Sequence, residues 1–264
     1  MRENVTIIGA GNLTQSLLEG IGKSTRLYNI NVVDIDRKKV SVLKKYNVKF
    51  HSQYTREISK SNVILLVTKP KDYAQVIKSI DPYVSNNTIV LSFMAGIKIK
   101  QIQELLTQKI IVVRCMTNLA ISVGNAFLFY FVNKSIKSLP NKLNKFLSSF
   151  ASIRRCHSEN NIDKLTALYG SGPAYYVFFN NIVKNTFTHM GFSKKESELY
   201  TNSLMSGSTN LIASNDTQDL LKLIASKGGT TEAALSQLKK DKVDKSVNKA
   251  IKEAYERSKK ILGK

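Results

Sequence analysis

The first 158 residues alternate short apolar runs with amphipathic stretches. The apolar runs are rich in Val, Ile and Leu, whereas stretches such as Leu13–Ile21 and Arg37–Tyr46 have helical spacing. Continuous apolar runs are typical of strands buried on both faces, because helices cover a parallel sheet above and below. The alternation predicts a doubly wound α/β sheet. The expected strands are Val5–Ile8, Ile30–Val33, Val63–Val67, Thr88–Leu91, Ile110–Val113, Ala126–Val132 and Ser152–Cys156.

From about Glu159 onward, the apolar residues keep helical spacing to the end of the chain. The spacing is first evident in the segment Ile162–Leu168. Later helices are expected over Asp216–Ala225, Thr230–Leu238 and Val243–Leu262. We therefore predict two domains, an α/β domain over residues 1–158 and an all-α domain over residues 159–264.

The composition is that of a globular protein with a buried core. Of the 264 residues, 42% are hydrophobic and 22% are charged, and no apolar run approaches the roughly 20 residues of a membrane-spanning helix. The first apolar strand begins at Val5, which leaves no room for the core of a secretory signal. Cys115, Cys156 and the three histidines have no metal-ligand spacing. We expect a cytoplasmic protein with no metal and no membrane partner.

The net charge of +21 allows two interpretations. Basic surfaces attract nucleic acids and anionic membranes through counterion release. Alternatively, the lysines form solvated helix surfaces, as the spacing of Lys38, Lys39, Lys44 and Lys45 indicates. We favour the second interpretation, because no basic tail and no recognisable nucleic-acid motif accompany the charge. No specific nucleic-acid partner is expected.

A glycine turn follows the first predicted strand. The segment Val5–Thr14 is expected to form a strand, a tight turn and a helix start. Gly9 permits the turn, and Gly11 lets the backbone approach a pyrophosphate, whose charge the N–H groups of Asn12 and Leu13 receive. A threonine replaces the third glycine of the usual fingerprint. The position of the turn at the first β-α junction predicts a Rossmann-type dinucleotide site.

Charged residues follow the second predicted strand. Asp34 lies 20 residues past Thr14, where a carboxylate can accept hydrogen bonds from the adenosine ribose hydroxyls. A carboxylate there repels a 2′-phosphate and favours NADH, whereas nearby Arg37 could accommodate NADPH. Alternatively, Asp34 and Asp36 only begin a turn and a helix. The expected cofactor is NADPH or NADH, with the preference left open.

Thr68-Lys69-Pro70 follows the predicted strand Val63–Val67. Ligands bind at the carboxyl ends of parallel strands, so Lys69 could point its ammonium group toward the cofactor or the substrate. A lysine followed by proline is also a common turn. Alone, this segment is weak evidence for a ligand site.

Six motifs occur in one order along the chain. They are Ile8-Gly-Ala-Gly-Asn12, Thr68-Lys-Pro70, Ser92-Phe-Met-Ala-Gly-Ile97, Arg114-Cys-Met-Thr-Asn118, Thr166-Ala-Leu-Tyr-Gly-Ser-Gly-Pro-Ala-Tyr175 and Lys227-Gly-Gly-Thr-Thr231. With these motifs, the sequence resembles the pyrroline-5-carboxylate reductase family over essentially its full length. The last two are the most specific, because neither belongs to dinucleotide-binding folds in general.

The resemblance implies an N-terminal NAD(P)-binding domain and a helical C-terminal domain that forms a homodimer, with rings of dimers in many members. It implies hydride transfer from NAD(P)H to the cyclic imine 1-pyrroline-5-carboxylate, which gives L-proline. The active site would lie where the helices of one subunit meet the cofactor domain of another. The expected cofactor-binding residues are Gly9, Gly11, Asn12, Leu13, Asp34, Thr68, Lys69, Pro70, Ala95, Gly96 and Asn118.

A glycine pair precedes the predicted helix Thr230–Leu238. Gly228 and Gly229 should leave backbone N–H groups unpaired at a helix start, where the dipole favours a substrate carboxylate. An ordinary helix cap explains Thr230 but leaves the second glycine and Thr231 unexplained. The resemblance implies that Thr231 hydrogen-bonds the imine nitrogen, which makes it the catalytic candidate. The expected substrate-binding residues are Lys69, Ser226, Gly228, Gly229, Thr230 and Thr231.

Three places depart from the family pattern. The segment Met116–Ala120 is Met-Thr-Asn-Leu-Ala where the family usually has Met-Pro-Asn-Thr-Pro, so the loop beside the nicotinamide is expected to be less rigid. Tyr169 replaces a usual serine, and Lys227 a usual proline. Two alternatives stay open: a related imine or β-hydroxyacid-type reductase with another substrate, and a catalytically impaired binding homologue. The Gly-Gly-Thr-Thr segment argues against the first, and the intact glycines and Lys69 argue against the second.

Overall fold

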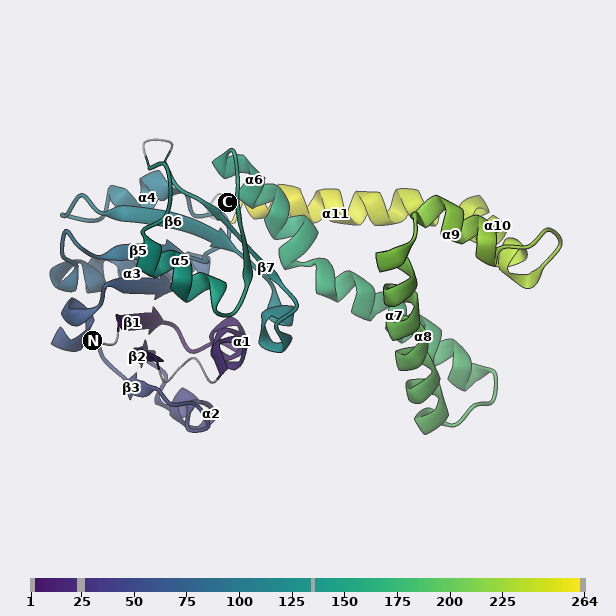
Figure 1. Cartoon of the computed structure of the whole chain (residues 1–264), viewed down its shortest axis with the longest axis horizontal. Coiled ribbons are helices and arrows are strands. Elements are labelled where there is room, and N and C mark those ends of the chain that lie inside the picture. The colour runs from purple at the N-terminus through teal and green to yellow at the C-terminus, as the bar shows by residue number, and fades with distance from the viewer. Residues whose placement is uncertain (1–2, 23–26, 134–135, 262–264) are drawn as a thin grey trace. The chain divides into compact units, whose positions relative to one another are not determined.

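The computed structural model describes residues 3–22, 27–133 and 136–261. The chain forms two compact units, whose elements are labelled in Figure 1. The first unit comprises Met1–Ser171 together with Ala254–Lys264, and the second comprises Gly172–Glu253. The chain therefore leaves the first unit once and returns to it near its end.

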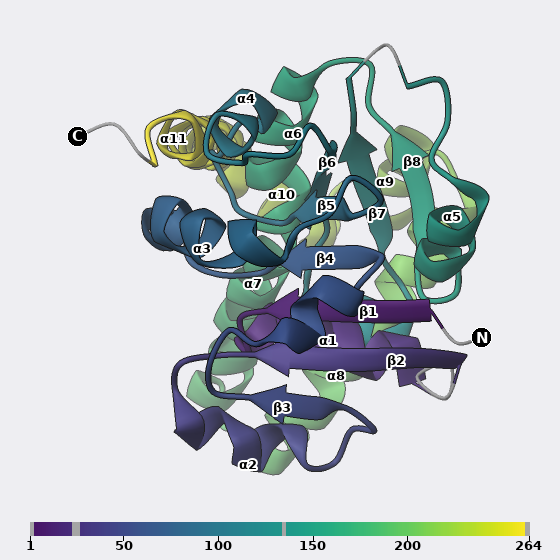
Figure 2. The ribbon, with the colours of Figure 1, turned by 90° about the vertical axis from the view of Figure 1, so that its left-hand side faces the viewer.

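An eight-stranded sheet forms the centre of the first unit, with the strand order β3-β2-β1-β4-β5-β6-β7-β8 (Figure 2). The strands are β1 (Glu3–Ile8), β2 (Tyr28–Val33), β3 (Lys49–His51), β4 (Val63–Leu66), β5 (Ile89–Ser92), β6 (Ile111–Met116), β7 (Phe127–Phe131) and β8 (Ser152–Arg155). All neighbouring strands are parallel except β6 and β7, which are antiparallel. The strand order reverses between β1 and β4, and such a switch point is where open α/β sheets bind ligands.

Apolar clusters cover both faces of the sheet. The helices of the first unit are α1 (Asn12–Ile21), α2 (Val40–Leu43), α3 (Tyr73–Ile80), α4 (Ile99–Gln103), α5 (Asn141–Ser148) and α6 (Glu159–Leu165). On one face, Leu17 of α1 and Phe146 of α5 pack with Leu65 of β4. On the other face, Ile77 of α3 packs in a cluster with Ile64 of the same strand. Because successive side chains point to opposite faces, β4 is apolar at every position, as its continuous apolar run predicted.

The predicted strands are confirmed, but two local predictions were incomplete. The short edge strand β3 was missed, because its three residues are only half-buried or exposed and include a lysine and a histidine. The helix predicted over Arg37–Tyr46 is a 3-10 turn, Arg37–Lys39, followed by the single turn of α2. None of the first three residues is buried, so no apolar face holds a longer helix there.

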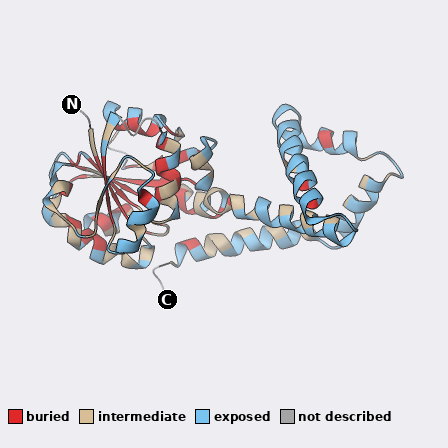
Figure 3. Cartoon of the chain, turned by 90° about the horizontal axis from the view of Figure 1, so that it is seen from below, coloured by how far each residue is buried: buried red, intermediate tan, exposed pale blue. Residues whose placement is uncertain are grey.

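The second unit is helical, as predicted. It contains α7 (Gly172–His189), α8 (Lys194–Ser214), α9 (Thr217–Ile224), α10 (Thr230–Lys240) and the first part of α11 (Val243–Lys259). Leu262, the predicted end of the last helix, lies outside the described residues. Large apolar side chains are exposed along these helices, which are mostly pale blue in Figure 3. Tyr176, Phe178 and Leu223 are 68%, 62% and 79% exposed. An apolar surface of this extent marks an interaction surface.

The first compact unit extends past the predicted domain boundary at residue 158. It includes α6 and the π-helical turn Thr166–Gly170. Arg114 of β6 is fully buried, and its Nη2 lies 2.6 Å from Oδ1 of Asp163 in α6. Lys98 binds the same carboxylate. This buried ion pairing holds α6 against the sheet. The compact unit therefore ends at Ser171, although the sequence pattern changes to helix already at residue 159.

Candidate active site

Gly9 forms a tight turn at the carboxyl end of β1. Its φ angle is +102°, and its N–H donates to the carbonyl oxygen of Val33 at 2.8 Å. A Cβ atom at this position would lie 2.7 Å from the carbonyl oxygen of Val67. Both the backbone conformation and the packing therefore require glycine.

Gly11 stands in open space. Its φ is an ordinary −77°, and a Cβ atom there would meet no heavy atom within 4 Å. Gly11 is the N-cap of α1 and has no side chain to cap the helix, so the first N–H groups, at Asn12 and Leu13, have no intrahelical acceptor. Thr14, which replaces the third glycine of the fingerprint, is buried and donates its hydroxyl to the carbonyl oxygen of Gly9 at 2.6 Å.

Asp34 connects the end of β2 to the glycine turn. Its Oδ2 accepts a hydrogen bond from the N–H of Ala10 at 2.7 Å, and its Oδ1 accepts one from the N–H of Asp36 at 2.9 Å. Each carboxylate oxygen can accept more than one hydrogen bond. Asp34 therefore shapes the turn and still has capacity for a ligand hydroxyl.

A cavity of about 480 Å³ opens at the carboxyl ends of β1, β2 and β4. Of the predicted cofactor-binding residues, it brings together Gly9, Gly11, Asp34, Thr68 and Lys69. The open side of Gly11 and the uncapped start of α1 fit a phosphate group, since nothing in the chain fills that space.

Sequence reasoning missed several residues of this cavity. They are Ile35, Asp36, Lys39, Tyr54, Lys71, Asp72, Gln75 and Ser79, together with nearby apolar residues. Lys39 and Lys71 follow the carboxyl ends of β2 and β4, so their proximity to a strand end was a usable signal. Burial raises the pKa of the Tyr54 phenol, and the charges of Asp34 and Asp72 raise it further. The Tyr54 hydroxyl is therefore protonated near neutral pH and can donate a hydrogen bond.

The other predicted cofactor residues lie at the same edge of the sheet, outside the lining of this cavity. Pro70 begins a 3-10 turn after β4. Ala95 and Gly96 follow β5, and Gly96, at φ +74°, backs closely onto the chain at Ser258. Asn118 follows β6 and is buried, with its Nδ2 donating to the carbonyl oxygen of Tyr169 at 3.1 Å.

The glycine pair predicted to bind the substrate belongs to the second unit. Gly228 has φ +74°, and its N–H donates to Oε2 of Glu232 at 2.6 Å. The N–H of Gly229 donates to the carbonyl oxygen of Ser226 at 3.0 Å, and Gly229 is the N-cap of α10 without a side-chain cap. The glycine N–H groups thus have protein acceptors. The first amides of α10, beginning at Thr230, are the donors that remain for an anion.

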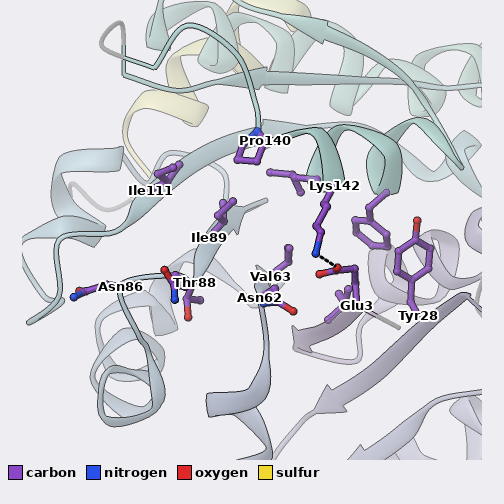
Figure 4. A pocket seen from close by; sticks show the side chains of 14 residues that line it. Glu3, Tyr28, Asn62, Val63, Asn86, Thr88, Ile89, Ile111, Pro140 and Lys142 are labelled. Atoms are coloured by element: carbon purple, nitrogen blue, oxygen red, sulfur yellow. Dashed lines mark ion pairs between the residues drawn. The ribbon is translucent and has the colours of Figure 1, made fainter. Parts of the chain in front are cut away.

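A second cavity, of about 340 Å³, lies at the opposite ends of the strands, where the parallel strands begin (Figure 4). Its floor is formed by apolar residues at the beginnings of strands, including Val63, Ile89 and Ile111. Glu3 and Lys142 form an ion pair of 2.7 Å within it. Because it lies at the amino ends of the parallel strands, it is remote from the switch point. We assign no chemistry to it.

The sheet order, the glycine turn at the switch point and the open helix start define a dinucleotide-binding protein of the α/β class. Among the described residues, no group of His, Cys, Asp or Glu is arranged to hold a metal ion. In the same part of the chain, no helix has the length and apolar character to cross a membrane.

Comparisons with known proteins identify the family. Residues 159–261 match the family model described as pyrroline-5-carboxylate reductase dimerisation, and residues 4–96 match the one described as NADP oxidoreductase coenzyme F420-dependent. A pyrroline-5-carboxylate reductase of Staphylococcus haemolyticus is 30% identical over 259 residues, covering 95% of this chain and 94% of the relative. Pyrroline-5-carboxylate reductase 2 of Bacillus subtilis is 27% identical over 265 residues, covering 98% and 95%.

Solved structures agree in fold. A Plasmodium falciparum pyrroline carboxylate reductase with NADP bound superposes with a TM-score of 0.86 at 24% identity, over 97% of each chain. A pyrroline-5-carboxylate reductase from Coxiella burnetii gives a TM-score of 0.82 at 24% identity, over the full length of both chains.

The chain belongs to the pyrroline-5-carboxylate reductase family. The predictions of this family, of an NAD(P)-dependent oxidoreductase and of a Rossmann-type domain followed by a helical dimerisation domain are confirmed. The match to the dimerisation model indicates a homodimer, and the matched residues include α7 and α8 with their exposed apolar side chains.

Proposed function

We propose that this protein reduces 1-pyrroline-5-carboxylate to L-proline with hydride from NADPH or NADH, the last step of proline biosynthesis. The observation that supports this most is the glycine turn at the switch point, where Gly11 leaves open space beside an uncapped helix start. The full-length similarity to pyrroline-5-carboxylate reductases specifies the substrate. The proposed partners are the small-molecule imine and further dimers in a ring. The proposed location is the cytoplasm, in keeping with the unpaired, buried Cys115 and Cys156.

The proposed cofactor position follows from the order of the strands. Asp34 at the end of β2 would bind the adenosine ribose, and the turn after β1 would bind the pyrophosphate through Asn12 and Leu13. A dinucleotide that crosses the switch point in this direction extends toward β4, β5 and β6. Its nicotinamide half would therefore meet the residues that follow these strands: Thr68, Lys69, Pro70, Ala95, Gly96 and Asn118.

The bound nicotinamide supplies the hydride, so the chain itself must orient the imine and stabilise its charges. We propose that the first amides of α10 bind the substrate carboxylate, helped by Ser226 and Thr230. Thr231 would donate a hydrogen bond from its hydroxyl to the imine nitrogen. The proton that this nitrogen gains, as the ring carbon gains the hydride, would come from solvent water through that hydroxyl. Lys69 is the positively charged residue that we propose for binding the substrate. These roles need no buried acid, consistent with an active site built mainly from amides and hydroxyls.

A direct assay tests the activity. Purified protein is mixed with 1-pyrroline-5-carboxylate and NADPH or NADH, and loss of the reduced-nicotinamide absorbance is followed. We expect oxidation of the reduced nicotinamide that depends on this imine and is slower with other cyclic imines. Reduction of the oxidised cofactor with β-hydroxyacids, the reverse direction, should also be slower. Folded protein that binds the dinucleotide but oxidises neither cofactor would refute the proposed activity.

Substitution of Thr231 tests its role at the imine. Loss of one hydrogen bond that strengthens in the transition state should lower kcat about 10- to 100-fold in Thr231→Ala, corresponding to about 1.4–2.8 kcal/mol. Thr217→Ala is a matched control, because Thr217, like Thr231, lies in the first turn of a helix of the second unit. Equal kcat values for Thr231→Ala and the control would show that another group serves the imine nitrogen.

Asp34→Ala tests the ribose assignment and the cofactor preference. Removing the carboxylate removes its hydrogen bonds to the ribose of either cofactor. It also removes the electrostatic repulsion between the carboxylate and the 2′-phosphate of NADPH. The KM for NADH should therefore rise more than the KM for NADPH. Since Asp34 also binds the N–H of Ala10, Asp34→Asn provides a second variant that keeps an acceptor oxygen. A uniform change of both KM values in the two variants would contradict the assignment.

A further inference from the structure

The loop after β6 carries Asn118 and has no proline, yet its backbone is held by side chains. Thr117 donates its hydroxyl to the carbonyl oxygen of Phe127 at 2.9 Å. Oδ1 of Asn118 accepts a hydrogen bond from the N–H of Ala120 at 2.9 Å. Hydrogen bonds thus fix both positions at which the chain lacks the prolines of its family.

Tyr169 contacts the same loop twice, from the π-helical turn Thr166–Gly170. The N–H of Phe127 donates to the Tyr169 hydroxyl at 2.7 Å. Nδ2 of Asn118 donates to the Tyr169 carbonyl oxygen at 3.1 Å. Phe127 therefore has its N–H bound by Tyr169 and its carbonyl bound by Thr117. Tyr169 thus links the start of β7 to the side-chain amide of Asn118.

The proline that follows the π-helical turn explains why the Tyr169 carbonyl can accept from Asn118. The N–H of Ser171 donates to the carbonyl oxygen of Thr166 at 3.1 Å, five residues back instead of the four of an α-helix. In an uninterrupted α-helix, the Tyr169 carbonyl would accept from the N–H of residue 173. That residue is Pro173, which has no N–H. The carbonyl is consequently available to a side chain from the loop.

Packing fixes the turn in place. The Tyr169 ring meets the Phe129 ring edge-on, with centroids 5.0 Å apart and an interplanar angle of 82°. A Cβ atom at Gly170 would lie 2.9 Å from Sδ of Met116. The turn therefore lies directly against the end of β6, and a larger residue at Gly170 would displace the Met116 side chain.

On its other side, the loop rests on α1. The carbonyl oxygen of Ile121 would lie 2.5 Å from a Cβ atom at Gly20, so the 3-10 turn Leu119–Val123 approaches the α1 backbone closely. The loop thus lies between the helix that begins at the pyrophosphate site and the turn that carries Tyr169. Its position depends on both contacts.

We propose that Tyr169 is a positioning residue for the nicotinamide half of the cofactor. It holds the loop after β6, and with it the Asn118 side chain, at the end of the sheet toward which the nicotinamide extends. This inference rests on the proposed function for the direction of the cofactor. Tyr169 acts through the loop and touches neither reactant.

Tyr169→Phe removes the hydroxyl and keeps the ring. Phe127 is 38% exposed, so water can replace the lost partner of its N–H and the melting temperature should change by less than about 4 °C. Hydrogen exchange of the Phe127 amide should accelerate at least about tenfold, and the dissociation constant for NADPH should rise about two- to tenfold, the equivalent of one net hydrogen bond. The KM for the imine should stay within about twofold of the unmodified protein.

Two further variants make the test specific. Tyr46→Phe removes a hydroxyl that contacts Glu19 on the surface and should leave NADPH affinity unchanged. Thr117→Val removes the other side-chain bond to Phe127, and its effect should combine non-additively with that of Tyr169→Phe, because both act on one backbone segment. Unchanged Phe127 exchange and unchanged NADPH affinity in Tyr169→Phe would overturn the proposal. NADPH binding is measured without turnover, so absence of reductase activity would count against the proposed function alone.

Discussion

Gly9 and Gly11 belong to one turn, but replacing each with alanine should impair a different property of the protein. A methyl group at Gly9 would be forced against the backbone of Val67, at a φ angle of +102°. A methyl group at Gly11 would meet no protein atom within 4 Å. We therefore expect Gly9→Ala to lose stability and Gly11→Ala to lose cofactor affinity.

The magnitude for Gly9→Ala follows from two costs. A left-handed backbone conformation at a residue with a Cβ atom costs about 1–2 kcal/mol. A contact of 2.7 Å with a backbone oxygen forces displacement of packed atoms, for about 1–3 kcal/mol more. The total of about 2–5 kcal/mol corresponds to a melting temperature lowered by about 4–20 °C in a domain of this size.

The cost for Gly11→Ala is chiefly in binding. A weaker N-cap destabilises α1 by less than about 1 kcal/mol. The methyl group would occupy the space through which a pyrophosphate approaches the helix start, so the dissociation constant for NADPH should rise about tenfold or more.

Thermal unfolding followed by circular dichroism, and titration of NADPH by its fluorescence, measure the two effects. Gly124→Ala serves as a control, because Gly124 is at φ +71° with no heavy atom near its Cβ position. It should lose only the conformational part of the stability. Two results would contradict these expectations: a Gly9→Ala variant that melts no lower than the Gly124 variant, or a Gly11→Ala variant that binds NADPH as tightly as the unmodified protein.

Two further predictions concern buried ionisable groups. Asp163→Asn removes the nearer of the two carboxylates paired with the fully buried Arg114 and leaves only Glu159, at 3.5 Å. Because Asp163 also pairs with Lys98, the free energy of unfolding should fall by about 3–5 kcal/mol. The exposed pair of Asp219 and Lys222 gives the control Asp219→Asn, which should cost less than about 1 kcal/mol in urea unfolding. Burial raises the pKa of the Cys115 thiol, so the folded protein keeps a proton that the unfolded chain releases above about pH 8.5. Stability should therefore fall as pH rises past that value, by at most about 1.4 kcal/mol per pH unit from this group. Cys115→Ala should flatten this decline in urea unfolding between pH 8 and 10.5, and equal slopes in the two proteins would contradict the assignment.

Much of the first unit could be predicted from the sequence because its signals are local. A strand buried on both faces, such as β4, is apolar at consecutive positions whatever surrounds it. The glycine turn is likewise encoded within a few residues, since Gly9 satisfies a backbone requirement of that turn. The edge strand β3 left no such signal, because half-exposed residues carry little apolar pattern.

The tertiary structure decided which residues meet. Sequence spacing suggested Asp34 for a ribose, but only the fold shows its carboxylate holding the N–H of Ala10. Lys39 and Tyr54 line one cavity with Gly11 and Asp34 because separate strands end on the same side of the sheet. The two replaced prolines suggested a looser loop, whereas Tyr169, more than 40 residues away, binds that loop.

By itself, then, the sequence determined most strands and helices, with β3 and the length of α2 as exceptions. It also determined the glycine turn and the family motifs, since each of these signals lies in residues close together in the chain. The tertiary structure alone decided the end of the first compact unit at Ser171 and the contacts of Tyr169. The unit boundary and the Tyr169 contacts are both set by residues that are distant in the chain but meet in the fold, as Arg114 and Asp163 do. Local periodicity carries no information on such pairs, because it records which face of an element is buried and not what covers it.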